Sequence, residues 1–250
     1  MNINSPEYIN SYFRYTNTLI VPYTALTTQC LNRLYMSKYP WRWMISPIKP
    51  SGIQADTVIK IRPYALDNGV YGYHKANVKF PFDIWLSYVE KYGENADFVV
   101  LPDVMANAYE TIKLAKEWKQ KLNHLTLVVV AQDGMKAKDL EEFCEQGIGI
   151  FIGGTTDFKL KTLPIWSELA RKYKVICHVG RVNSKTRMSY VRGHKATSFD
   201  GSGMAKYFHQ ARDLTDALLK LELQKKYALF KREDKIFEET IEKYKLTHGS

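Results

Sequence analysis

The sequence lacks the marks of several protein classes. It has only three cysteines in 250 residues, Cys30, Cys144 and Cys177, and no CxxC pair. The usual spacing of a structural zinc site is therefore absent, and free thiols in a reducing compartment are expected. No run of 18 apolar residues occurs, and the polar N-terminus has no signal-peptide core. We expect a cytoplasmic protein with no membrane segment, no metal and no cofactor.

Basic residues outnumber acidic ones. The chain has 36 Lys and Arg against 26 Asp and Glu, a net charge of +10, while 45% of its residues are hydrophobic. Such a chain is globular, and its charge predicts a polyanionic partner, most simply nucleic acid. Aromatic and basic residues mix at 39–43 (YPWRW), a composition that suits base stacking and phosphate binding. The alternative is that these rings belong to the core.

Strands and helices alternate from residue 62 onward. No GxGxxG fingerprint follows the first strand, which disfavours an open dinucleotide-binding sheet. Alternation with nearly continuous apolar strands predicts a parallel sheet covered on both faces. Six such units, with more chain before them, favour an α/β fold, a (β/α)8 TIM-like barrel that spans residues 1–210. A helical tail at 211–250 is expected to pack on or beside it. The expected strands are 64–66, 96–101, 125–131, 148–152, 175–179 and 196–200, and the helices between and after them are 82–92, 108–122, 139–146, 163–173, 185–192 and 202–212.

Polar residues or glycines follow each of these strands. In a barrel of this type the carboxyl ends of the strands form one rim, where catalytic groups gather. Each residue taken singly is also a normal helix cap or turn former, but six in phase favour a site. The rim residues are Asp67, Asp103, Gln132, Gly153 with Gly154, Arg181 and Asp200.

Three carboxylates and an amide suit a purine ligand. A carboxylate accepts two hydrogen bonds side by side, as guanine N1–H and N2–H₂ offer, while an amide or backbone N–H donates to O6. Paired acids also suit chemistry at an anomeric carbon, one as nucleophile and the other as proton shuttle. His178 and His194 are isolated in sequence and are expected to be structural, and Ser198 has no evident Ser-His-Asp arrangement.

The order and spacing of six short motifs resemble the guanine transglycosylase superfamily, and most closely its DNA-modifying branch, the DpdA proteins of phages and bacterial modification clusters. The likeness covers about residues 60–205. Two departures from the tRNA enzymes stand out: Asp67 is followed by Asn-Gly-Val-Tyr in place of Ser-Gly-Gly-Phe, and their zinc site of three Cys and one His is missing. The motifs are 66–69 (LDNG), 98–103 (FVVLPD), 130–134 (VAQDG), 152–154 (IGG), 178–181 (HVGR) and 198–201 (SFDG).

This resemblance implies exchange of guanine in a polynucleotide for a 7-deazaguanine such as 7-cyano-7-deazaguanine, in a phage-infected or bacterial cell. Asp200 would be the nucleophile on C1′. Asp67 would protonate the departing guanine and deprotonate the incoming base. The residues alone leave open which acid attacks.

The same resemblance assigns the base-binding groups. Asp103 would hold the N1/N2 edge, and Gln132 with the Gly153 and Gly154 backbone would hold O6. Arg181, from its place on the rim, is a candidate for phosphate.

A basic segment follows Arg181 and is a candidate clamp for the strand, against the alternative of an ordinary solvated helix. Three alternatives to a DNA enzyme stay open: a tRNA-type enzyme, a catalytically silent nucleic-acid-binding subunit, and a barrel enzyme acting on a small phosphorylated metabolite. An accessory protein or a homodimer is also open. The segment's residues are Lys185, Arg187, Arg192 and Lys195.

Overall fold

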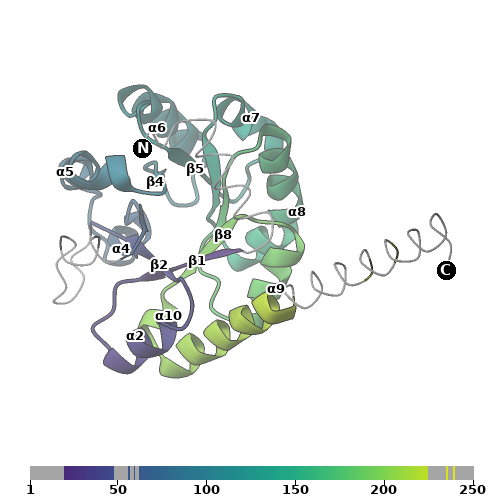
Figure 1. Cartoon of the computed structure of the whole chain (residues 1–250). Helices are drawn as coiled ribbons and strands as arrows, with labels where there is room; N and C mark the ends of the chain where they lie inside the picture. Colours follow the sequence, from purple (N-terminus) through teal and green to yellow (C-terminus); the bar gives the residue numbers. More distant parts are fainter. Residues whose placement is uncertain are drawn as a thin grey trace.

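A computed structural model of the chain describes residues 20–47, 56, 59, 62–224, 235 and 239. Eight strands pair in sequence order, all parallel, and close into one barrel with the helices outside it (Figure 1). The predicted (β/α)8 barrel is therefore confirmed. The strands are β1 (Val21–Ala25), β2 (Arg42–Ile45), β3 (Tyr64–Leu66), β4 (Val99–Val100), β5 (Leu127–Ala131), β6 (Gly149–Ile152), β7 (Cys177–Val179) and β8 (Ser198–Gly201).

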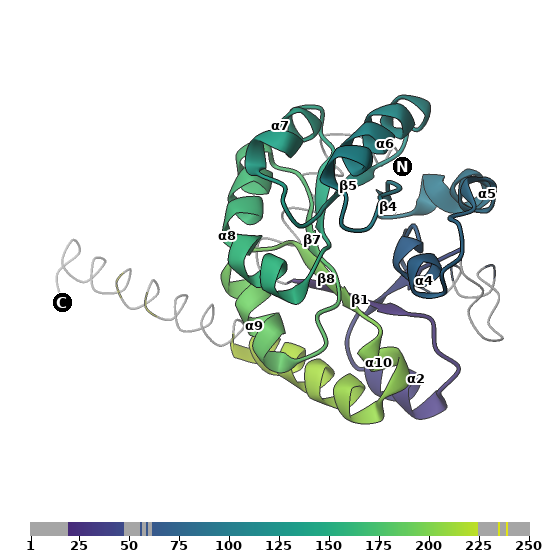
Figure 2. The ribbon, with the colours of Figure 1, turned by 180° about the vertical axis from the view of Figure 1, so that it is seen from behind.

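The helices form the outer ring, which Figure 2 shows from the opposite side. Beyond them, residues 208–224 are also helical. The helices are α2 (Cys30–Met36), α4 (Val70–Lys75), α5 (Phe82–Tyr92), the 3-10 turn η1 (Gly93–Asn95), α6 (Ala108–Lys121), α7 (Ala137–Glu145), α8 (Thr156–Tyr173), α9 (Lys185–Gly193) and α10 (Gly203–Lys206).

Apolar side chains pack in two layers. Inward-facing residues of alternate strand positions, such as Val21, Met44, Val100 and Val128, fill the barrel. The opposite faces of the same strands pack against the helices in a larger cluster. This is why the strands read as continuous apolar runs, since both of their faces are buried.

Strand β4 is shorter than the predicted strand 96–101, although backbone pairing extends beyond it. The Asp97 N–H donates to the Tyr64 carbonyl at 2.7 Å, and the Leu101 N–H donates to Val128 at 3.0 Å. The neighbouring strands therefore hold this whole stretch, and Asp103 leaves the sheet at the carboxyl rim.

Helix α8 begins at Thr156, seven residues before the predicted start at 163. Thr155 caps it by accepting the Phe158 N–H, and Pro164 lies inside it. Proline lacks the N–H that would bond to the Leu160 carbonyl. The Tyr190 hydroxyl donates to that carbonyl instead, at 2.8 Å. A tertiary contact thus stabilises a proline within the helix.

The predicted helix 202–212 is two helices. Tyr207 has an extended backbone, with φ −124° and ψ 119°, between α10 and the helix 208–224. The latter packs on the outside of the barrel: Leu214 and Leu218 are buried, and Thr215 accepts a hydrogen bond from the Trp41 indole at 3.0 Å. The expected division at residue 210 falls within this helix, and most of the predicted tail beyond 224 lies outside the described residues.

Candidate active site

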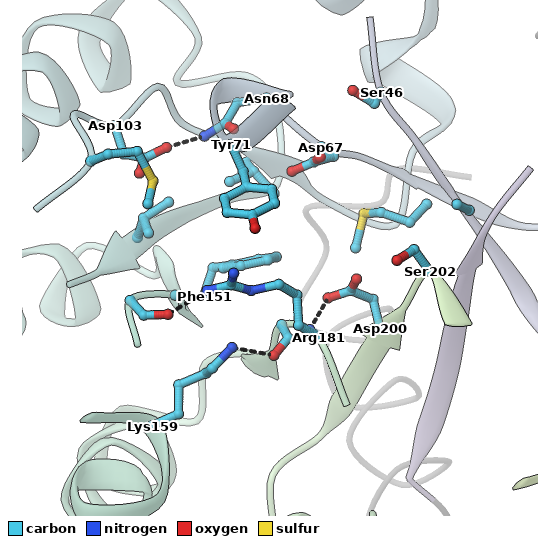
Figure 3. A pocket seen from close by; sticks show the side chains of 18 residues that line it. Ser46, Asp67, Asn68, Tyr71, Asp103, Phe151, Lys159, Arg181, Asp200 and Ser202 are labelled. Carbon is cyan, nitrogen blue, oxygen red and sulfur yellow. Dashed lines mark hydrogen bonds between the residues drawn. The ribbon is translucent and has the colours of Figure 1, made fainter. Parts of the chain in front are cut away.

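A cavity of about 230 Å³ opens at the carboxyl ends of the strands (Figure 3). Of the predicted site residues, Gln132 and the four basic residues at 185–195 do not line it. Residues that the sequence reasoning did not select also line it, including Ser46, Tyr71, Phe151 and Lys159. The predicted residues that do line it are Asp67, Asp103, Gly153, Gly154, Arg181 and Asp200.

Asp200 in β8 presents one carboxylate oxygen to the cavity. Its Oδ1 lies 3.1 Å from His178 Nε2 and accepts the Arg181 N–H at 3.2 Å. Both hydrogen bonds given to this carboxylate by the described residues end on Oδ1. The Oδ2 atom is therefore the oxygen that remains for a ligand.

His178 links Asp200 to Ser198. The His178 Nδ1 atom lies 2.9 Å from Ser198 Oγ, and the ring stacks on Phe151 with centroids 4.8 Å apart. Burial lowers the pKa of His178, against the opposing effect of Asp200. A neutral ring that donates from Nε2 to Asp200 and accepts from the Ser198 hydroxyl at Nδ1 satisfies all three groups.

His178 is a buried and hydrogen-bonded histidine, but it is not isolated in the structure, because it contacts both Ser198 and Asp200. Strands β7 and β8 are neighbours with His178 paired to Ser198, and Ser198 and Asp200 share a strand face because side chains alternate. The alternation of side chains along this strand is the signal in the sequence that could have linked Ser198 with Asp200. Ser198 is fully buried, so the arrangement presents an acid to the cavity and not a serine nucleophile.

Asp67 follows β3, and the pKa of its carboxyl group is raised. Burial, then repulsion from Asp200 and Asp103, raises its pKa to about 7, although the N–H groups of Gly69 and Asn68 oppose this. A carboxyl group that titrates near neutral pH is suited to give and to take a proton.

Asp103 is held by two amides. Asn68 Nδ2 donates to its Oδ1 at 2.7 Å, and Gln132 Nε2 donates to its Oδ2. Burial raises its pKa to about 6, while these two hydrogen bonds act in the opposite direction. Gln132 is buried and also accepts the Ala106 N–H at 2.9 Å. Gln132 therefore faces Asp103 in this arrangement.

The opposite wall of the cavity is basic. Lys159, in the first turn of α8, donates to the Gly180 carbonyl at 2.8 Å. Arg181 donates to the Gly154 carbonyl, and its guanidinium lies 4.6 Å from the centre of the Tyr71 ring. Burial, with Arg181 as the next cause, lowers the pKa of Lys159 to about 8. Nothing in the sequence pattern distinguishes Lys159 from the exposed lysines of the same helix.

The four basic residues at 185–195 lie at two ends of α9. This helix returns from the carboxyl end of β7 to the amino end of β8, and its nine residues span about 13 Å. Lys185 and Arg187 begin it on the cavity side, while Arg192 and Lys195 belong to the opposite end. They do not form one cluster.

Within the part of the chain that the structure describes, no group of three His, Cys, Asp or Glu side chains is placed to hold a metal ion. No helix in the same residues is long and apolar enough to cross a membrane.

The molecule thus belongs to the class of (β/α)8 barrels that carry an acid-lined cavity at the carboxyl rim. No protein-family model matches the chain. No curated protein matches it either.

Solved structures of tryptophan synthase from M. tuberculosis are similar in fold. An open form has a TM-score of 0.50 at 12% identity, covering 84% of this chain and 96% of that one. A ligand-free mutant form has a TM-score of 0.48 at 11% identity, covering 85% and 96%. At this identity the likeness concerns the barrel alone, a fold that is common among enzymes.

Proposed function

We propose that this protein is a DNA guanine transglycosylase, which exchanges guanine in DNA for a 7-deazaguanine base through a covalent aspartyl-glycosyl intermediate. The observation that carries the proposal is the set of three acids around one cavity, of which Asp200 keeps one oxygen free while Asp67 titrates near neutral pH. The resemblance to the guanine transglycosylase superfamily implies the same roles for these acids.

In the first step, Asp200 Oδ2 attacks C1′ of the target nucleotide. A C1′–O bond forms as the C1′–N9 bond breaks, and the electron pair leaves with guanine. Protonated Asp67 gives its proton to the departing base, which leaves neutral. The hydrogen bonds from His178 and the Arg181 N–H hold the other carboxylate oxygen, so the attacking oxygen has a defined direction.

In the second step, Asp67 takes the N9 proton of the incoming 7-deazaguanine. The base attacks C1′, the C1′–O bond breaks, and Asp200 is regenerated as a carboxylate. Two displacements at C1′ retain its configuration, as in retaining glycosidases.

Asp103 would accept N1–H and N2–H₂ of the base, with Asn68 and Gln132 setting its orientation. The Gly153 N–H already donates to the Ala131 carbonyl at 3.0 Å. We therefore propose that the Gly154 N–H donates to O6 of the base. Gln132 would reach O6 only after leaving Asp103.

DNA is the proposed polymer because the chain has a net charge of +10 and resembles the DNA-modifying branch. In a duplex the target base must be flipped out, at a cost of a few kcal/mol. Lys185 and Arg187 lie on the cavity side of α9 and are the proposed contacts to the strand.

The test is base exchange. Duplex DNA or tRNA carrying radiolabelled guanine is incubated with the protein and 7-cyano-7-deazaguanine, and released guanine is counted for the wild type and Asp200→Asn. Asp157→Asn is the matched control, because that carboxylate is 75% exposed and pairs with Lys161 on α8. We expect release from DNA in the wild type and control, and a loss of at least about a thousandfold in Asp200→Asn.

Each other outcome has a meaning. Release from tRNA alone would keep the chemistry and change the polymer. Equal release by Asp200→Asn would exclude the aspartyl intermediate. No release from either polymer, with DNA still bound, would favour a silent binding subunit. No affinity for nucleic acid even at low salt would favour an enzyme of small phosphorylated metabolites.

A further inference from the structure

Two cations, Lys159 and Arg181, lie in the cavity wall, and Asp200 and Asp133 are near enough to raise the pKa of Lys159. Lys159 is only 6% exposed. Neither Lys159 nor Arg181 takes part in an ion pair with another described residue. Their hydrogen bonds go to backbone carbonyls of Gly180 and Gly154. Buried charged groups are usually paired, so the buried Lys159 ammonium, with the half-buried Arg181 beside it, favours an anionic ligand at this wall.

The lysine keeps both its charge and free donors. An ammonium group has three N–H donors, and the described contacts use one. Since its pKa is lowered only to about 8, it remains mostly charged at pH 7. Arg187, at the start of α9, is close enough to contribute to that lowering. The basic character of the wall thus extends toward the rim.

The charges in the cavity are unevenly placed. Asp67 and Asp103 follow β3 and β4, while Lys159 in α8 and Arg181 after β7 lie across the barrel from them, with Asp200 of β8 beside Arg181 (Figure 3). A ligand that offers hydrogen-bond donors on one edge and a negative charge on another would match both walls.

We propose that Lys159 and Arg181 form an anion subsite of this cavity, which binds a phosphate or carboxylate group of the substrate. The idea that the ligand is a base whose N–H donors meet Asp103 rests on the proposed function. The anion subsite itself rests on the two cations. Two sources supply the same chemistry: the phosphate of the flipped nucleotide, and an acidic substituent at position 7 of the incoming base.

Matched ligand pairs separate these sources. Isothermal titration calorimetry at one ionic strength compares deoxyguanosine with its 5′-monophosphate, and 7-cyano-7-deazaguanine with 7-carboxy-7-deazaguanine. Inorganic phosphate is titrated separately. The variants are Lys159→Met, Arg181→Met and the control Lys161→Met, a 73% exposed lysine two residues along the same helix.

We expect the anionic member of one pair to bind about tenfold more tightly, a difference of about 1.4 kcal/mol. That preference should disappear in Lys159→Met and Arg181→Met, persist in Lys161→Met, and weaken above pH 8. The pair that shows it identifies the source. If Lys159→Met does not fold, Arg181→Met decides alone.

Phosphate binding that depends on Lys159, without binding of any guanine ligand, would support the subsite and contradict the proposed function. Absence of anion preference and of phosphate binding in the wild type would overturn the subsite. A preference that survives both substitutions would overturn it as well.

Discussion

At the scale of single residues, the carboxylate of Asp200 shows how a buried contact makes its two oxygens differ. An isolated aspartate has two equivalent oxygens. Here His178 and the Arg181 N–H both bind Oδ1, so Oδ2 is the oxygen that would attack in the proposed reaction. His178 is itself fixed by Ser198 and by stacking on Phe151. His178 is therefore a positioning residue in the proposed reaction.

Replacing His178 tests this role. His178→Phe keeps an aromatic ring against Phe151 and removes the donor to Asp200. Loss of a hydrogen bond to a charged group costs about 1.5–3 kcal/mol, so kcat for base exchange should fall roughly tenfold to a hundredfold, with KM little changed. The burst of covalent DNA adduct, trapped by denaturation, should slow by the same factor.

His178→Gln is the matched rescue, since its amide can donate to Oδ1. It should recover part of kcat if positioning matters. Equal losses in both variants, tracking a loss of Tm, would assign His178 a purely structural role.

The rim acids were predictable because each follows a readable strand. Asp67, Asp103 and Asp200 all line the cavity, as expected from the barrel pattern. Lys159 and Tyr71 were not predictable, because they lie within helices and reach the cavity only through the way α8 and α4 pack on the barrel. Gln132 follows β5 as expected, yet it donates to Asp103 and does not line the cavity.

At the scale of elements, helix α9 separates four basic residues that look like one segment in the sequence. Lys185 and Arg187 lie at the cavity end, and Arg192 and Lys195 at the other. In the proposed reaction only the first pair lies at the end of α9 where a DNA strand would present its base to the cavity.

We therefore predict unequal effects on DNA binding. The double variant Lys185→Gln with Arg187→Gln should weaken binding and lower the slope of log K against log salt by up to about 2, since each phosphate contact contributes about 0.9. Arg192→Gln with Lys195→Gln removes the same charge from the far end and should leave the slope nearly unchanged. Fluorescence anisotropy over a salt series measures both. If both double variants lower the slope by the same amount, the DNA strand does not run past the cavity end of α9.

At the scale of the whole molecule, the site has a stability cost. Asp67 has its pKa raised to about 7 and Asp103 to about 6, mainly through burial. The folded state thus binds protons more tightly than the unfolded state, whose aspartates titrate near 3.9. Between about pH 4 and 7 these two groups make the folded protein less stable as pH rises.

Asp67→Asn removes one of these groups and should stabilise the protein. The expected gain at pH 8 is about 1–2 kcal/mol, reduced because the carboxyl group keeps some access to water, and it raises Tm by a few degrees. The gain should be much smaller near pH 4, where the folded-state carboxyl is protonated and the unfolded-state carboxyl is about half protonated. Calorimetry at the two pH values measures it, with Asp157→Asn reporting the effect of losing an exposed negative charge. A gain of the same size at pH 4 would contradict the assigned cause.

The alternation of apolar strands and helices by itself determined the barrel and the order of its rim residues, because both strand faces are buried and parallel strands share one carboxyl end. Only the tertiary structure decided which side chains face the cavity. The His178–Asp200 contact depends on strand register, the buried Lys159 on helix packing, and the Pro164 position in α8 on a hydroxyl from Tyr190. Such contacts join residues about 20 or more positions apart, and local patterns carry no information on how those residues meet.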